Sequence, residues 1–220
     1  MMGRTHALTG VAAGIAVTYG ITLSVPAAIA GTFICAGSAL VPDIDHKDST
    51  ITKTFGPITK IVSFVVRKIS GGHRIGTHSF LGIAAIGAMA QYGVQNRYTL
   101  PGAILLCFLM CLAIGGAVRL LRIPGWFDDL APIPVVIGIV RFTHISLDMV
   151  PLAIMLGCLI HVAGDVATKG GCPLWWPFSF KRIKLDLFKT DGFTERWIIT
   201  PVVIVCIFAG IFWKLLDNVM

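Results

Sequence analysis

Seven apolar stretches make up most of this 220-residue chain and limit what it can fold into. A helix needs about 20 mostly apolar residues to cross the hydrocarbon core of a bilayer, and most of these stretches approach that length. Only 13% of the residues are charged, about half the share that is typical of soluble domains. We therefore predict an all-α fold, a polytopic transmembrane helical bundle that forms one domain over residues 1–220. The expected membrane segments are residues 7–23, 25–41, 79–95, 100–118, 130–143, 147–164 and 198–216.

The basic residues lie mainly in the connections between the apolar stretches, and their distribution predicts a topology. If the N-terminus is cytoplasmic and all seven stretches cross, 15 of the 18 lysine and arginine residues lie on the cytoplasmic side. Cytoplasmic loops are enriched in these residues, so the pattern favours seven crossings and an external C-terminus. The alternative is a re-entrant or interfacial stretch at 130–143, which contains Pro132 and Pro134. That arrangement would make the charge distribution much more even.

The net charge of +7 also bears on the partners of the chain. In a soluble protein it would suggest nucleic-acid binding, but here membrane topology accounts for it, so no nucleic-acid partner is expected. Membrane lipid is the expected partner, and the basic loops could also contact anionic headgroups. The sequence does not determine the oligomeric state.

The long connection at 43–78 contains a predicted surface helix, which begins at Pro57 and ends before Gly71. Its apolar residues follow helical spacing, and basic residues form another side. This pattern is typical of a basic amphipathic helix that lies in the membrane interface. A helix packed on the protein itself is the alternative. The apolar residues are Ile58, Ile61, Val62, Val65 and Ile69, and the basic ones are Lys60, Arg67 and Lys68.

Histidine and aspartate residues gather in four short motifs at the ends of apolar segments. Charged and imidazole side chains are costly at membrane depth, so we interpret these as functional. The predicted topology places all four motifs at the cytoplasmic face. They are Thr5-His6 in the first segment, Pro42-Asp43-Ile44-Asp45-His46 after the second, His73 to Ser79 at the start of the third, and His161-x3-Asp165 at the end of the sixth.

Each motif alone has a simpler explanation, such as a helix cap, solvated carboxylates at a helix stop, or a hydrogen-bonded pair four residues apart. Their joint placement favours a shared metal site. Imidazole and carboxylate ligands together suit Zn, Mn or Fe better than Mg or Ca. The predicted ligands, which could hold one or two divalent ions, are His6, Asp43, Asp45, His73, His78, His161 and Asp165, with His46 as a weaker eighth.

The four motifs resemble those of the membrane-bound metal-dependent hydrolase family. The matching features are THxxTG near the N-terminus, PDIDH after the first hairpin, HRxxTHS at the next segment, and HxxxD followed by glycine and proline. In this chain they span residues 5–178. The resemblance implies a hydrolase of the bacterial inner membrane but no particular substrate. The glycine-rich surroundings of the HR motif depart from the family pattern, and the segment at 198–216 is not matched.

Taken with this resemblance, the motifs predict a hydrolase that uses metal-activated water at the cytoplasmic lipid–water boundary. A phosphoester or another amphiphilic, lipid-linked substrate would suit that position. Arg74 is expected to bind substrate oxygens, because its guanidinium stays charged and its fork suits phosphate or carboxylate. The alternative is an anchor that pairs with lipid headgroups at the cytoplasmic face. Asp45 is assigned to catalysis as well as to the metal. No GxSxG or P-loop motif occurs in the sequence.

The alternative is a non-enzymatic membrane protein, namely a metal-stabilised scaffold, a regulator or a transporter. Ionisable residues within membrane segments also mark ion pathways. A second His-x3-Asp motif, His144 and Asp148, lies near the opposite face and could extend such a pathway. A helix-boundary histidine and a capping aspartate are the simpler interpretation of that pair.

Overall fold

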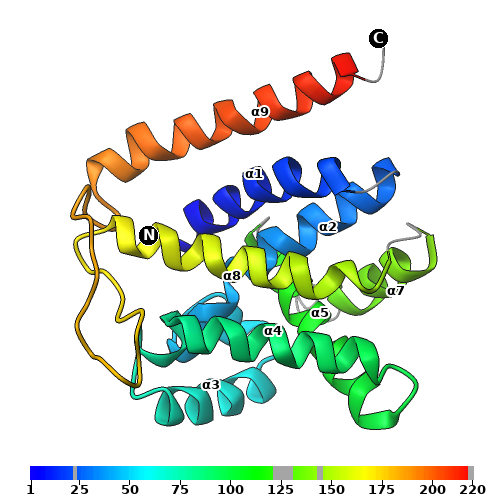
Figure 1. Ribbon diagram of the computed structural model, residues 1–220, viewed down its shortest axis with the longest axis horizontal. Helices are drawn as coiled ribbons and strands as arrows, with labels where there is room; N and C mark the ends of the chain where they lie inside the picture. Colours follow the sequence, from blue (N-terminus) through cyan, green and yellow to red (C-terminus); the bar gives the residue numbers. More distant parts are fainter. Residues whose placement is uncertain (22–23, 121–130, 143–145, 218–220) are drawn as a thin grey trace.

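The computed structural model describes residues 1–21, 24–120, 131–142 and 146–217, and these residues form eight α-helices and no β-strand. Most of the helices run roughly side by side along the long axis of the molecule (Figure 1). The prediction of an all-α fold is therefore confirmed. The helices are α1 (Gly3–Ile21), α2 (Val25–Ser38), α3 (Pro57–Ile69), α4 (Phe80–Gln95), α5 (Leu100–Leu120), α7 (Pro132–Phe142), α8 (Met149–Ala167) and α9 (Thr200–Asp217).

Four helical stretches are long and apolar enough to cross a bilayer, which is fewer than the seven crossings that we predicted. Helices α4 and α7 are apolar but have only 16 and 11 residues, short of the ~20 that a crossing needs. Helix α1 is not among the four, and its first turns carry Arg4, Thr5 and His6. The four stretches are Val25–Asp45, Leu100–Arg119, Met149–Ala167 and Glu195–Lys214.

Small residues allow the central helices to approach one another closely. A Cβ atom on Gly37 of α2 would collide with the carbonyl group of Ala113 on α5, and one on Gly157 of α8 would collide with the carbonyl oxygen of Cys35. Lipid tails are as apolar as leucine, so helices in a bilayer associate through close packing, and small residues favour it. The core of the bundle is therefore built on α2, with α5 and α8 packed directly against it.

Helix α9 lies along α1 at the edge of the bundle (Figure 1), where a Cβ on Gly210 would lie 3.3 Å from Ile15 Cγ2. The turn that precedes it, Glu195–Ile199, begins with Glu195, whose side chain is fully buried and accepts a hydrogen bond from the backbone N–H of Met2 at 2.7 Å. The hydroxyls of Thr5 and Thr200 are 3.4 Å apart. Helices α1 and α9 thus start at the same end of the molecule and run in the same direction. The N-terminus and the end of α9 therefore lie at opposite ends of the molecule (Figure 1).

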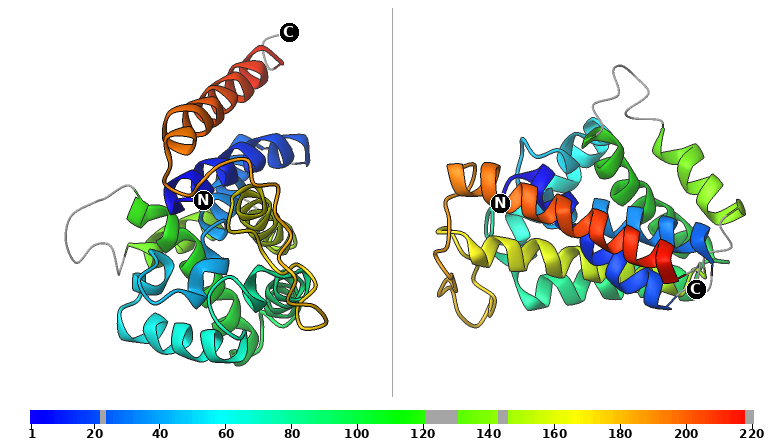
Figure 2. Two further views of the ribbon diagram at one scale, coloured as in Figure 1. Left: turned by 90° about the vertical axis from the view of Figure 1, so that its left-hand side faces the viewer. Right: turned by 90° about the horizontal axis from the view of Figure 1, so that it is seen from above.

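Helix α3 has the bounds that the sequence predicted. In the end-on view, α4 and α8 are seen almost along their axes, whereas α3 runs across the view (Figure 2, left). Its polar residues Thr59 and Ser63 are buried against the protein, while Ile61 and Ile69 are 65% and 72% exposed. An outward-facing apolar side favours a helix in the membrane interface over one whose apolar side packs on the protein.

We predict that the N-terminus is cytoplasmic and the C-terminus external. Reporter proteins fused after Arg97 and after the last residue should both behave as external, because the basic residues concentrate on the other side. A fusion within 47–56, in the basic connection before α3, is the internal control. A cytoplasmic signal from the C-terminal fusion would contradict the external C-terminus.

A second prediction tests the close packing of α2. Gly37→Ala should destabilise the bundle by about 1–3 kcal/mol, because the methyl group forces α2 and α5 apart. Gly138→Ala on α7 is the matched control, since a Cβ there meets no atom within 4 Å. It should be neutral or stabilising by up to about 1 kcal/mol. Thermal unfolding in detergent micelles measures both, and equal stability of the two variants would argue against this packing.

Candidate metal centre

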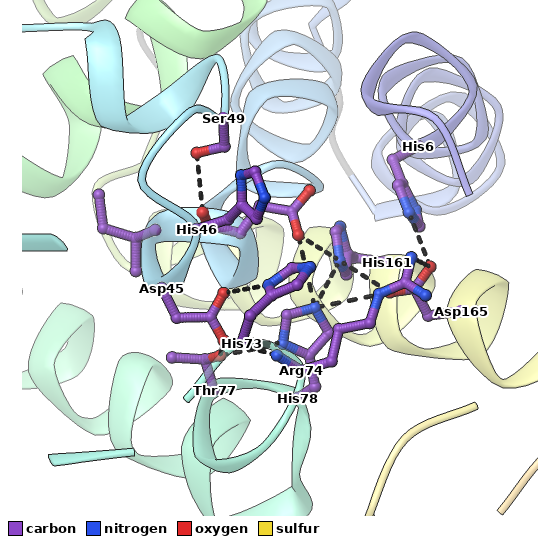
Figure 3. A network of polar contacts seen from close by, with 12 residues as sticks. His6, Asp45, His46, Ser49, His73, Arg74, Thr77, His78, His161 and Asp165 are labelled. Carbon is purple, nitrogen blue, oxygen red and sulfur yellow. Dashed lines mark hydrogen bonds and ion pairs between the residues drawn. The ribbon is translucent and has the colours of Figure 1, made fainter. Parts of the chain in front are cut away.

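Four chain segments bring the histidine and aspartate motifs together at one end of the bundle. Helix α2 ends at Ser38, and the 3-10 turn that follows, Val41–Asp45, begins around Pro42, which cannot donate a helical hydrogen bond. A second 3-10 turn, Gly76–His78, precedes α4. The last two turns of α8 carry one further histidine and aspartate, and the first turn of α1 adds a histidine (Figure 3). The structure thus places all seven predicted ligands in one cluster.

Two imidazole nitrogens and two carboxylate oxygens within this cluster face one another. The Nε2 atoms of His78 and His161 are 3.0 Å apart. Asp43 Oδ1 lies 3.6 Å and 3.7 Å from these two nitrogens, and Asp165 Oδ2 lies 3.5 Å and 3.6 Å from them. Ligands at the usual bond lengths around a tetrahedral zinc ion are about 3.3–3.4 Å from each other. Each of the two carboxylate oxygens therefore lies close enough to both nitrogens to share an ion with them, and Asp43, His78 and His161 form one such set of ligands.

The hydrogen bonds of His161 leave its Nε2 free to bind a cation. Its Nδ1 lies 2.7 Å from the carbonyl oxygen of Ala39, which can only accept, so Nδ1 carries the proton. The lone pair of the neutral ring is then on Nε2. A backbone carbonyl behind the ring is a usual way to fix the tautomer and the orientation of a metal-binding histidine.

His78 is fixed in the same way by Thr77 and Asp45. The hydroxyl of Thr77 donates its hydrogen to Asp45 Oδ2 at 2.5 Å, so it accepts from His78 Nδ1 at 2.9 Å. In the neutral ring the proton of His78 is thereby placed on Nδ1, and its Nε2 lone pair faces that of His161. Two such lone pairs 3.0 Å apart repel unless a proton or a metal ion lies between them.

The two carboxylate oxygens of Asp165 have different surroundings. Oδ1 accepts from the amino group of Met1, from Arg74 at 2.8 Å and from His6 Nε2 at 3.2 Å. Oδ2 is buried and has no hydrogen-bond partner, although it lies beside the two Nε2 atoms. A buried carboxylate oxygen without a partner is costly, and a cation at the centre of the four atoms would satisfy it. These residues therefore fit a divalent metal.

The remaining predicted ligands surround this four-atom set. The His6 ring stacks on His161 at 3.7 Å between centroids. Asp45 is fully buried and lies behind His78, where its Oδ1 bonds His73 Nδ1 at 2.8 Å. Two other groupings also have ligand atoms close enough to share an ion, so a second ion is compatible with the geometry. These groupings are His6, His161 and Asp165, and Asp43, Asp45 and His73.

The electrostatic balance at His78 follows from its two carboxylate neighbours. Burial alone would lower the pKa of His78, but hydrogen bonds with Asp43 and Asp45 outweigh that effect and raise the pKa to about 9. A proton on His78 and a divalent cation would therefore compete for the same negative charge.

A polar cavity of about 350 Å³ opens beside the cluster. Its wall includes Asp43 from the four-atom set, and His46, His73 and Arg74. The Arg74 side chain is 17% exposed, and its Nε is buried without a partner, so the guanidinium has donors left after its bond with Asp165. The cavity is thus positively charged on one side and adjoins the candidate metal position.

Two groups that orient the metal-binding histidines were not predicted from the sequence. The carbonyl of Ala39 is a backbone group, which no residue type reveals. Thr77 does have a sequence signal, since it directly precedes His78 within the HRxxTHS motif. Of the second His-x3-Asp pair, His144 lies outside the described residues, and Asp148 is exposed at the start of α8, far along the helix from Asp165.

A comparison with protein families places the chain among known proteins. Residues 1–218 match the family model described as YdjM inner membrane protein. The chain belongs to the YdjM inner membrane protein family. No curated protein and no solved structure matches it. The family and the apolar helices together establish an inner membrane protein, as the sequence predicted. The family description assigns no reaction.

Replacing Asp165 with Asn should lower the affinity for Zn²⁺ or Mn²⁺ more than about 100-fold, because changes behind the ligands already cost about 10- to 100-fold. Thr77→Val removes the acceptor for His78 Nδ1 and should cost about tenfold. Competition with a chelator, followed by elemental analysis of the purified protein, measures both. Asp148→Asn, at the exposed start of the same helix, is the matched control. Metal loss in the control, or none in Asp165→Asn, would contradict the assignment.

Proposed function

We propose that this protein is a metal-dependent hydrolase that cleaves a phosphoester in an amphiphilic substrate at the cytoplasmic surface of the inner membrane. The observation that carries the proposal is the partnerless Oδ2 of Asp165 beside two imidazole nitrogens, next to an open cavity that Asp43, His73 and Arg74 line. Asp43 both faces the two Nε2 atoms and lines the cavity, so water or a substrate in the cavity could reach the ion, as a catalytic site requires. We favour Zn, Mn or Fe over Mg or Ca because two of the four ligands are imidazoles.

Asp43, His78, His161 and Asp165 would hold the ion. When bound, such an ion supplies Lewis-acid chemistry and activates water near neutral pH. The oxygen of water forms a bond to phosphorus, the ester P–O bond breaks with its electron pair on the leaving oxygen, and that oxygen gains a proton from the water. The products are an alcohol and a phosphate.

His73 is suited to carry the proton to the leaving oxygen. It lines the cavity with its side chain 37% exposed, and its Nδ1 bonds the buried carboxylate of Asp45. A carboxylate behind an imidazole orients the ring and stabilises its protonated form. The sequence analysis assigned His73 to the metal, whereas this role makes it the general acid, with Asp45 as its positioning residue. Arg74 has guanidinium donors for the phosphate oxygens.

The second candidate is a metal-stabilised scaffold, regulator or transporter. The observation in its favour is that the cluster ties α1, α2 and α8 to the turn before α4, as a structural ion would. The open cavity beside Asp43 and His73 argues for the hydrolase, because a structural site has no need of it. The ligand groupings among the described residues also lie at one end of the bundle and do not line a path through it.

The test uses the purified full-length protein with Zn²⁺ or Mn²⁺ and two soluble probes, 4-nitrophenyl phosphate and bis(4-nitrophenyl) phosphate. At least one should be hydrolysed. His73→Ala should lower turnover about 100-fold or more while the bound metal is retained, because only proton transfer is lost. Asp165→Asn should lose metal and turnover together, and Asp148→Asn should change neither. A metal-loaded protein that hydrolyses neither probe would favour the scaffold or transporter.

A further inference from the structure

An apolar groove of about 340 Å³ lies on the outside of α1, α2 and α5, next to the polar cavity. Small residues keep it open, among them Ala7 of α1, Ala36 of α2 and Ala117 of α5. Apart from Arg4 and Thr32, every residue that lines it is apolar. It therefore suits a hydrocarbon chain and not a polar ligand.

The groove begins about one helical turn from the metal cavity. On α1, Gly3 lines the cavity, while Ala7 and Val11 line the groove. Residues four apart share one helix face, so these three lie in a row on successive turns. On the other wall, Leu40 lines the cavity and Ala36, four residues earlier, lines the groove. A Cβ on Gly3 would lie 3.6 Å from Leu40 Cδ2, so these two residues face each other where the cavity meets the groove.

Two arginines lie along this path; of the two aspartates that line the cavity, Asp43 is a proposed metal ligand and Asp48 pairs with Lys47 at 3.8 Å. Arg4 lies at the groove and is exposed, and Arg74 lines the cavity. An arginine at a membrane surface can extend its charged group towards the headgroups. A phosphate ester in the cavity would therefore meet Arg74, and its linkage to the chain would pass Arg4.

We propose that the groove holds the hydrocarbon chain of the substrate, so that the substrate is a phosphate ester of a membrane lipid that enters sideways from the bilayer. This inference rests on the proposed hydrolase function. Lipid tails and the groove are equally apolar, so moving a chain from the bilayer into the groove contributes little to the binding free energy. Its contribution is to fix the position of the headgroup at the metal cavity.

A second apolar groove of about 450 Å³ between α3, α4 and α5 is the rival position for the chain. It is lined by Thr77 and Ala85, but by none of the four proposed metal ligands. The side chain of Asp45, which is fully buried, and that of Thr77 stand between it and His78. A chain in this groove would be separated from the cavity that Asp43 and Arg74 line. We therefore assign the substrate chain to the first groove.

The test is cross-linking in lipid nanodiscs with phosphatidic acid that carries a photoreactive diazirine in its acyl chain. Cross-links should occur at residues 7–11 and 32–36. Ala117→Trp should reduce them about tenfold, because the indole fills the groove. Val11→Trp, on a different helix, should do the same, and retained metal shows that each variant is folded. Ala85→Trp, which fills the rival groove, is the matched control and should leave these cross-links unchanged.

A competition experiment distinguishes binding of the whole lipid from binding of its phosphate group alone. Hexadecyl phosphate should displace the photoreactive lipid from residues 7–11, whereas inorganic phosphate at the same concentration should not. Displacement by inorganic phosphate would show that only the headgroup is bound and would overturn the proposal. So would cross-links that are unaffected by Ala117→Trp and Val11→Trp, or that shift to the rival groove.

The result is independent of the proposed hydrolysis, because cross-linking needs no turnover. Groove-specific cross-links without hydrolysis of any ester would support the lipid site and contradict the enzyme. Hydrolysis of the soluble probes without groove-specific cross-links would support the enzyme and contradict the lipid site.

Discussion

The carboxylate of Asp165 joins parts of the chain that are distant in the sequence. Its Oδ1 accepts hydrogen bonds from the first turn of α1 and from Arg74, while its Oδ2 faces His78 and His161 without a partner. Burial of such a group is tolerable only when both oxygens are satisfied. The contacts around it therefore hold α1 and the turn before α4 against the end of α8. His6, Arg74, His78 and His161 all lie against this one side chain.

Much of the fold and of the site could be predicted from the sequence, and the failures have physical causes. Apolar length and the proline and glycine boundaries of 57–69 were sufficient for an all-α fold and for α3. The number of crossings was overestimated because apolar character does not fix where a helix ends. Helices α4 and α7 stop after 16 and 11 residues.

The cluster could be predicted because its residues are expensive in a membrane, but the separate roles within it could not. His73 and His78 have the same side chain and lie five residues apart. They differ in the hydrogen-bond partner of Nδ1, which is Thr77 for His78 and Asp45 for His73. They also differ in exposure, since His78 is fully buried and the His73 side chain is 37% exposed. Similarly, Asp43 and Asp45 come from one motif, yet Asp43 faces the Nε2 atoms and Asp45 accepts from His73, Thr77 and the backbone of Arg74. Such differences arise only from tertiary packing.

The wide sequence spacing of the ligands has a consequence for how the bundle is assembled. In sequence, 122 residues separate Ala39 from His161, whose side chain its carbonyl orients. An ion held by Asp43 and Asp165 would act as a cross-link that closes one long loop of the chain. Such a link restricts the unfolded chain far more than the folded one. The conformational entropy that it removes from the unfolded chain grows with the length of the loop. Metal supply would then set how firmly the helices are held together at this end, while the far end would be held by packing and by the buried hydrogen bonds of Thr18.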